Sequence, residues 1–194
     1  LFYQLSFNMK LFLILILTLS AYLSSQDYLD YPHPYHSTET TKGMVVSQNY
    51  LSSDIGAEIL SKGGNAVDAA IAVGFSLTAT LPRAGNIGGG GFMLVYDKKT
   101  ESIISFDFRS MSPKLATPDV YKVNGVHQYE LSEEGYKAIA VPGTVAGLIE
   151  AHEMFGTMDL ADLVNPTIEL LKEGVPVTDD LYWAINDTES LKKD

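Results

Sequence analysis

The chain has 194 residues, of which 46% are hydrophobic, so it is long and apolar enough to bury the core of one domain of ordinary size. The formal net charge of -11 and the pI near 4.7 argue against a nucleic-acid partner, because 13 lysines and arginines spread along the chain supply no clustered basic surface for phosphates. With no cysteine, the chain has no disulfide, no thiol nucleophile and no thiolate metal site.

The N-terminus has the three zones of a secretory signal peptide. Met9 and Lys10 precede an apolar run, which small and polar residues follow. The apolar stretch from Leu11 to Leu23 is shorter than the roughly 20 residues that cross a bilayer, so cleavage is favoured over the alternative of an N-terminal membrane anchor. We therefore expect residues 1–25 to be a signal peptide, which can include an over-extended start, and the mature protein to be periplasmic or secreted without stable membrane insertion.

Residues 26–42 contain aromatic residues, prolines and polar residues without a period, which is typical of an extended linker. His33 and His36 resemble a metal-binding pair, but a third ligand and an ordered scaffold are missing nearby. Two solvated linker histidines are the favoured interpretation, and no metal site is expected. The folded part is then expected at residues 43–194.

Residues 43–47 predict a short buried strand. The helix predicted after this strand has four apolar residues on one face and ends at Gly63 and Gly64. These four apolar residues are Leu51, Ile55, Ile59 and Leu60.

A second helix is predicted at residues 66–81. Asn65 and Asp68 match a capping box at its start, and Pro82 closes it. Because apolar residues, many of them alanine, surround this helix nearly completely, we expect it to be buried between layers.

A glycine-rich loop at residues 83–91 separates this helix from two predicted strands. The strands, at residues 92–96 and 102–108, flank a short polar turn that favours an antiparallel hairpin. A phosphate-binding loop requires a strand before its glycines and a helix after them; here the order is reversed, and Phe92 stands in place of the P-loop lysine. The glycines either let the backbone pass tightly beneath another segment or expose N–H groups toward a reacting oxygen.

Beyond the hairpin, residues 113–137 are predicted to be irregular. Three helical stretches follow, at about 144–155, 160–172 and 178–185, with Pro166 at the first turn of the main segment of the second stretch. This order of helices, a hairpin and further helices is typical of an α+β fold with an antiparallel sheet covered by helices. No closing element follows the last stretch, so we expect a truncated part of a longer protein.

Signatures of a nucleophile are missing from the sequence. No G-x-S-x-G motif occurs, and His152-Glu153 lacks the second histidine of a zinc-protease helix. His127 and His152 are expected to be ordinary surface or partly packed residues. A serine hydrolase or zinc protease therefore finds no support, and no catalytic residue is assigned in this chain.

Arg109 ends the second predicted strand, whose alternate positions are apolar. A planar guanidinium in this place can bind a substrate carboxylate through two parallel hydrogen bonds. The strand by itself favours the alternative, a salt bridge with a neighbouring acid such as Asp107, because arginines often form structural pairs.

Four motifs taken together reverse this preference. In order and spacing they resemble the start of the large subunit of the gamma-glutamyltranspeptidase family, over roughly residues 43–185. Each glycine motif is weak alone, whereas four in sequence are highly specific. The motifs are Gly63 to Ala70, Gly85 to Phe92, Asp107 to Arg109 with Met111 to Pro113, and Val141 to Gly147.

The resemblance implies an α/β protein of the α+β type, a fragment of a four-layer αββα N-terminal-nucleophile hydrolase whose precursor cuts itself into a large and a small subunit. In that family the exposed threonine attacks the γ-glutamyl amide of glutathione and related compounds without a cofactor, and its own amine is the general base. The resemblance also implies that Arg109 binds the substrate α-carboxylate and that the glycine loop is structural. The nucleophile belongs to the small subunit, so this fragment alone is expected to be inactive.

Ser110 follows Arg109 where bacterial members of the family usually carry glutamate, so the arginine lacks that support here. Two alternatives stay open. A cephalosporin-acylase-type amidohydrolase of the same superfamily shares the glycine motifs and hydrolyses a different acyl group, and a substrate without the α-carboxylate would make Arg109 dispensable. A non-catalytic exported binding protein is the alternative from another class.

Overall fold

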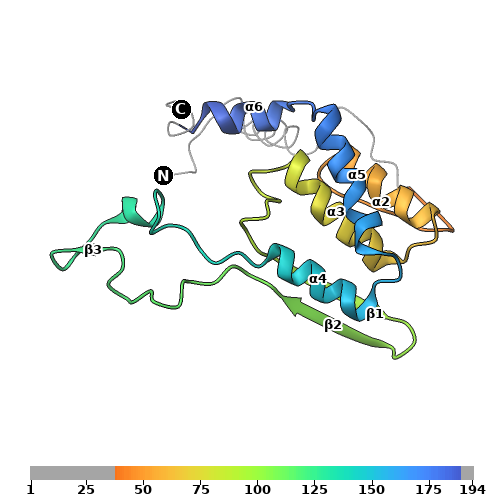
Figure 1. The fold of residues 1–194 in the computed structure, drawn as a ribbon, viewed down its shortest axis with the longest axis horizontal. Helices are drawn as coiled ribbons and strands as arrows, with labels where there is room; N and C mark the ends of the chain where they lie inside the picture. Colours follow the sequence, from red (N-terminus) through yellow and green to blue (C-terminus); the bar gives the residue numbers. More distant parts are fainter. Residues whose placement is uncertain (1–37, 189–194) are drawn as a thin grey trace, which may run out of the picture. The chain divides into compact units, whose positions relative to one another are not determined.

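The computed structural model describes residues 38–188, which form helices, one main antiparallel hairpin and shorter elements (Figure 1). The predicted signal peptide at residues 1–25, together with His33 and His36, lies outside the described residues and stays a prediction. Residues 38–42, at the end of the predicted linker, are exposed and form no helix or strand. None of the helices within residues 38–188 meets the length and hydropathy that a membrane-spanning helix requires.

Two helices open the compact unit that begins at Lys42: α2 (Tyr50–Ser61) and α3 (Ala66–Thr80). The capping box predicted for α3 is present, with Asn65 and Asp68 each accepting a hydrogen bond from the other's main-chain N–H. Buried side chains occur along the whole length of α3, which confirms the prediction of a helix buried between layers.

The strand predicted at residues 43–47 is not formed. Val45 is half-buried beside Gly56 of α2, whereas Val46 is exposed. A strand must satisfy its N–H and C=O groups on a neighbouring strand, and none pairs with this segment within residues 38–188. The segment therefore lies against the helices as extended chain.

The helix α3 is the centre of the helical packing, in contact with α2, α4 (Thr144–Phe155) and α5 (Leu160–Glu173). The prediction that Pro166 lies at a first turn is wrong, because α5 is one continuous helix with Pro166 in its interior. Leu163 and Thr167, on either side of the proline, are both buried. This burial offsets the hydrogen bond that proline removes from a helix.

The hairpin is formed by β1 (Phe92–Asp97) and β2 (Ser102–Asp107), paired antiparallel as predicted. Side chains on one face belong to the hydrophobic core shared with the helices, and the ring of Phe106 meets Phe155 of α4 edge to face at 6.2 Å. Figure 1 shows α4 running alongside β2. The opposite face of the hairpin is exposed and apolar, with Phe92, Leu94, Tyr96 and Ile103.

Residues 111–141 form an excursion between the hairpin and α4, closed at its base by an antiparallel bridge from Met111 to Val141. The prediction of an irregular segment is correct except for short elements. A tight turn with positive φ at Asn124 and Gly125 allows a minimal hairpin. The elements are β3 (Lys122–Val123), β4 (Val126–His127) and the 3-10 helix η2 (Tyr129–Ser132).

The last described helix is α6 (Asp179–Asn186), which begins at Thr178, whose hydroxyl accepts a hydrogen bond from the N–H of Leu181 at 3.3 Å. None of its residues is buried. Helices and hairpin are thus segregated along the chain, and the helices cover one face of the antiparallel sheet, as the sequence predicts for an α+β fold.

Candidate functional site

Arg109 lies two residues beyond the end of β2, with an exposed side chain. Its main-chain N–H donates a hydrogen bond of 3.1 Å to the carboxylate of Asp107. The guanidinium itself has no hydrogen bond or ion pair with any residue of the range 38–188. The salt bridge to Asp107, considered from the strand alone, is therefore not formed, and Asp107 instead fixes the main chain at Arg109.

The glycine-rich loop supports this main chain from one side. Gly91 and Phe108 exchange two hydrogen bonds, of 3.3 and 3.1 Å. A Cβ atom at Gly90 would lie 2.5 Å from the carbonyl oxygen of Phe108 and 2.8 Å from the carbonyl carbon of Arg109, closer than real Cβ contacts come. Of the two interpretations of the glycines, a tight passage beneath another segment is the one the contacts support.

The start of α4 also packs against this main chain and is bonded to the glycine-rich loop. The N–H groups of Gly143 and Thr144 both donate to the carbonyl oxygen of Gly89, at 2.8 and 3.2 Å. A Cβ atom at Gly143 would overlap the carbonyl oxygen of Phe108, and a Cβ atom at Gly147 would overlap the aromatic ring of Phe108. Three of the four sequence motifs therefore converge on Phe108, next to Arg109.

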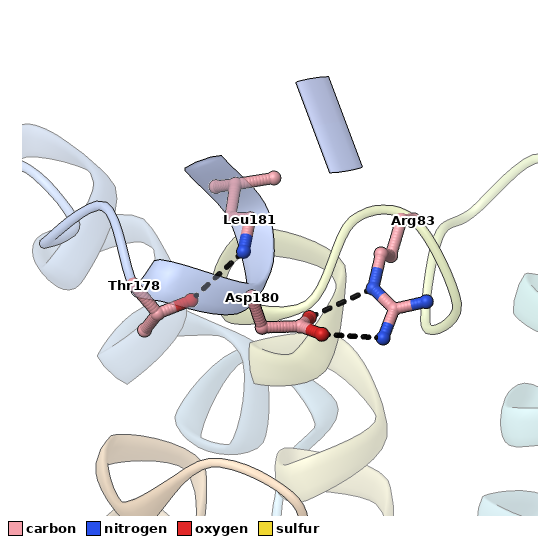
Figure 2. Close-up of polar contacts among 4 residues, drawn as sticks. All are labelled: Arg83, Thr178, Asp180 and Leu181. Carbon is pink, nitrogen blue, oxygen red and sulfur yellow. Dashed lines mark hydrogen bonds and ion pairs between the residues drawn. The ribbon is translucent and has the colours of Figure 1, made fainter. Parts of the chain in front are cut away.

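The other arginine of the chain provides a contrast (Figure 2). Arg83 binds Asp180 of α6 through two parallel hydrogen bonds, from Nε to Oδ2 at 2.7 Å and from Nη2 to Oδ1 at 2.6 Å. The hydrogen bond and charge of Asp180 raise the pKa of Arg83, and those of Arg83 lower the pKa of Asp180. Arg109 has the same fork of donors, and no carboxylate within residues 38–188 occupies it.

Asp68, in the first turn of α3, is a buried carboxylate, and its hydrogen bonds identify it as structural. It is 0% exposed and accepts hydrogen bonds from the N–H groups of Asn65, Thr157 and Met158 and from the hydroxyl of Thr157. Burial acts to raise the pKa of Asp68, but the hydrogen bonds, led by the Thr157 hydroxyl, outweigh burial and lower it. The sequence predicted only the role of Asp68 in the helix cap. The hydrogen bonds from Thr157 and Met158 span about 90 residues, so no local sequence pattern predicts them.

The histidines within the described ranges have ordinary surroundings. His152 Nε2 lies 2.7 Å from the carbonyl oxygen of Met158, and the ring of His127 meets Tyr121 at 6.2 Å. Among residues 38–188, no group of three acidic or histidine side chains is placed to hold a metal ion.

A sequence-family model described as gamma-glutamyltranspeptidase matches residues 52–194, most of the chain. The chain belongs to the gamma-glutamyltranspeptidase family. It is 44% identical over 147 residues to the glutathione hydrolase proenzyme of Bacillus subtilis strain 168, an alignment that covers 75% of this chain and 25% of that protein. The chain thus spans about a quarter of the length of the curated relatives it matches.

Solved structures of the family share the fold. The gamma-glutamyltranspeptidase of Helicobacter pylori superposes with a TM-score of 0.76 and 36% identity, over 81% of this chain and 47% of that one. A cephalosporin acylase from Bacillus halodurans superposes with a TM-score of 0.69 and 33% identity, over 84% and 31% of the two chains. The α+β class is confirmed, and the chain is part of the larger N-terminal-nucleophile hydrolase fold of this family.

Proposed function

We propose that this chain is the substrate-anchoring part of an enzyme that hydrolyses or transfers γ-glutamyl groups of glutathione and related compounds, with Arg109 binding the α-carboxylate of the donor. The observation that carries the proposal is the guanidinium of Arg109, which is exposed and unpaired within residues 38–188, while contacts with Asp107, the glycine-rich loop and the start of α4 hold the main chain at and next to it. Family membership supports the same role.

The physical argument concerns pre-organisation. The two hydrogen bonds between Gly91 and Phe108, the hydrogen bond that the N–H of Arg109 donates to Asp107, and the close contact of Gly90 fix the backbone from which the guanidinium extends. An arginine whose main chain is already fixed loses less conformational freedom when its guanidinium binds a carboxylate, so more of the hydrogen-bond energy contributes to affinity. Charge-assisted bidentate bonds are also among the stronger polar contacts available to a protein.

The bond-breaking step is assigned to the small subunit of the same precursor. The hydroxyl of an N-terminal threonine of that subunit attacks the γ-glutamyl amide, and the threonine's own amine accepts the hydroxyl proton. The C–N bond of the amide breaks, the leaving amine takes up that proton, and the γ-glutamyl group is held as an ester on the threonine. Water or an acceptor amine then attacks this ester, takes the γ-glutamyl group and frees the threonine. These reaction steps require no cofactor. The exposed apolar face of the hairpin, with Leu94 and Ile103 each about 70% exposed, is where we place contact with the rest of the precursor.

Export accompanies this function in our proposal. The signal-peptide pattern at residues 1–25 supports a periplasmic or secreted enzyme. Glutathione and other γ-glutamyl compounds would then be processed outside the cytoplasm.

The decisive experiment is Arg109→Lys in the full-length precursor. Lysine keeps the charge but cannot form two parallel bonds, so we expect KM for a γ-glutamyl anilide to rise roughly 10-fold with a smaller change in kcat. Arg83→Lys is the matched control, because Arg83 is the other arginine and its carboxylate partner is internal. Wild-type KM in Arg109→Lys would refute the anchor.

The similarity to a cephalosporin acylase favours testing that activity as an alternative. Cleavage of a second donor substrate distinguishes the two activities. A 4-aminobutyryl anilide has the same amide but no α-carboxylate. If Arg109 binds that carboxylate, Arg109→Lys should leave the weak cleavage of this donor unchanged. An equal loss with both donors would show that Arg109 supports the fold rather than the carboxylate, and efficient wild-type cleavage of this donor would favour the acylase type.

A further inference from the structure

The helix α6 has only half-buried and exposed residues. None of its eight residues is buried, and Tyr182 and Trp183 are both more than half exposed. Residues 174–178, which connect it to α5, form no regular structure. Its main-chain hydrogen bonds, the cap at Thr178 and the side-chain bonds of Asn186 and Thr188 run only to neighbours in sequence.

One contact crosses from α6 to another part of the fold. Within residues 38–188, the ion pair from Arg83 to Asp180 is the only hydrogen bond or ion pair between α6 and a residue outside 178–188 (Figure 2). The other three ion pairs of the described chain join residues three or four positions apart on the chain. Arg83 belongs to the turn that follows α3, so this pair joins segments 97 residues apart.

Such a contact is sensitive to salt. Both side chains are about half exposed, at 51% and 49%, so dissolved ions reach them. The Debye length falls from about 10 Å at 0.1 M salt to about 3 Å at 1 M, which screens exposed charges. A free helix of this length is marginal in water, because nucleation is costly and packing supplies most helical stability.

We propose that α6 is a detachable helix, fastened at the end of α3 by the Arg83–Asp180 pair and released with loss of helical structure when that pair is screened or removed. The pair has the bidentate geometry with which an exposed ion pair contributes measurably to stability. No side chain of α6 is buried, so no buried contact of α6 adds to this attachment. The inference does not depend on the proposed function.

The experiment measures hydrogen exchange of the α6 amides by mass spectrometry in the 194-residue chain. In the wild type we expect exchange in α6 to accelerate on the order of two- to fivefold between 0.1 and 1 M NaCl. In Arg83→Gln, which leaves the sequence of α6 unchanged, exchange should already be fast at 0.1 M and should not respond to salt. The fluorescence anisotropy of Trp183, the one tryptophan of the chain, should fall in parallel.

Two controls make the result specific. Lys62→Gln removes an ion pair of similar length and exposure on α2, at 2.6 Å to Glu58, and should leave exchange in α6 at the wild-type rate. Amides of α3 in Arg83→Gln should keep wild-type protection. Salt-independent exchange of α6 in the wild type, or wild-type exchange in Arg83→Gln, would overturn the proposal.

Discussion

Asp68 and Arg109 are charged residues with opposite surroundings. Asp68 is fully buried and accepts hydrogen bonds from three N–H groups and one hydroxyl, whereas the guanidinium of Arg109 is exposed and unpaired within residues 38–188. A buried charge costs several kcal/mol unless it is fully hydrogen-bonded, so Asp68 stabilises the fold as an anion. Arg109 has no such role in the described chain and is available to a ligand.

Asp68→Asn should destabilise the protein by about 2–3 kcal/mol. The amide replaces one acceptor oxygen by an NH2 group with two N–H donors, so N–H donors of Thr157, Met158 or Asn65 lose their partner. Chemical denaturation gives the free energy of unfolding. Asp54→Asn, an exposed acid of α2, is the control and should change stability by less than about 0.5 kcal/mol.

The pH dependence of stability gives the same residue a second test. The pKa of Asp68 is lower in the folded protein than its ordinary value near 3.8, so the ionised form stabilises the fold above that value. This contribution is lost as the pH falls through the lowered folded-state pKa. The stability difference between wild type and Asp68→Asn should therefore shrink below about pH 4. A difference that is constant from pH 7 to pH 3 would contradict this assignment.

At the scale of elements, the helix α5 contains one buried hydroxyl without a hydrogen-bond partner in the described part of the chain. Thr167 of α5 is 5% exposed, and its hydroxyl has no hydrogen-bond partner among residues 38–188. Thr80 of α3 is equally buried, but its hydroxyl bonds to Ser52 and to the carbonyl oxygen of Ser76. The two threonines form a matched pair for testing what a buried hydroxyl contributes.

Thr167→Val should raise the free energy of unfolding by about 1 kcal/mol, because valine keeps the shape and removes an unpaired polar group. Thr80→Val should lower it by about 1 kcal/mol, because Ser52 then loses its partner. Thermal and denaturant unfolding measure both changes. Destabilisation by Thr167→Val would indicate that its hydroxyl is bonded in solution.

The elements that could be predicted from sequence are those with local causes. The capping box at Asn65 and Asp68 and the glycine after α4 define helix ends through bonds to neighbours in sequence. The wrong predictions depend on distant partners. Residues 43–47 have strand-forming residues, but no strand of the described range 38–188 lies beside them. Pro166 lies inside α5 because burial on both sides of it outweighs the local cost.

For the whole molecule, the hairpin has one covered and one open face. Its outer face exposes Phe92, Leu94, Tyr96 and Ile103, an apolar surface of the kind that marks an interaction site. The 194-residue chain alone should therefore bind a hydrophobic dye such as anilinonaphthalene sulfonate. Leu94→Lys should lower this signal about twofold, whereas Met154→Lys, at an exposed position of α4, should not. Equal signals in the two variants would place the apolar surface elsewhere.

The sequence by itself determined the family, the order of the helices and hairpin, and the identity of the candidate anchor, because glycines, caps and alternating apolar residues act over a few positions. It left open whether Arg109 pairs with Asp107 and what the glycines do. The tertiary structure decided both, because only folding brings Gly90, Phe108 and Gly143 together and leaves the guanidinium without a partner in the described chain. The pair from Arg83 to Asp180 likewise has no sequence signal, since a contact across 97 residues is set by packing rather than by spacing.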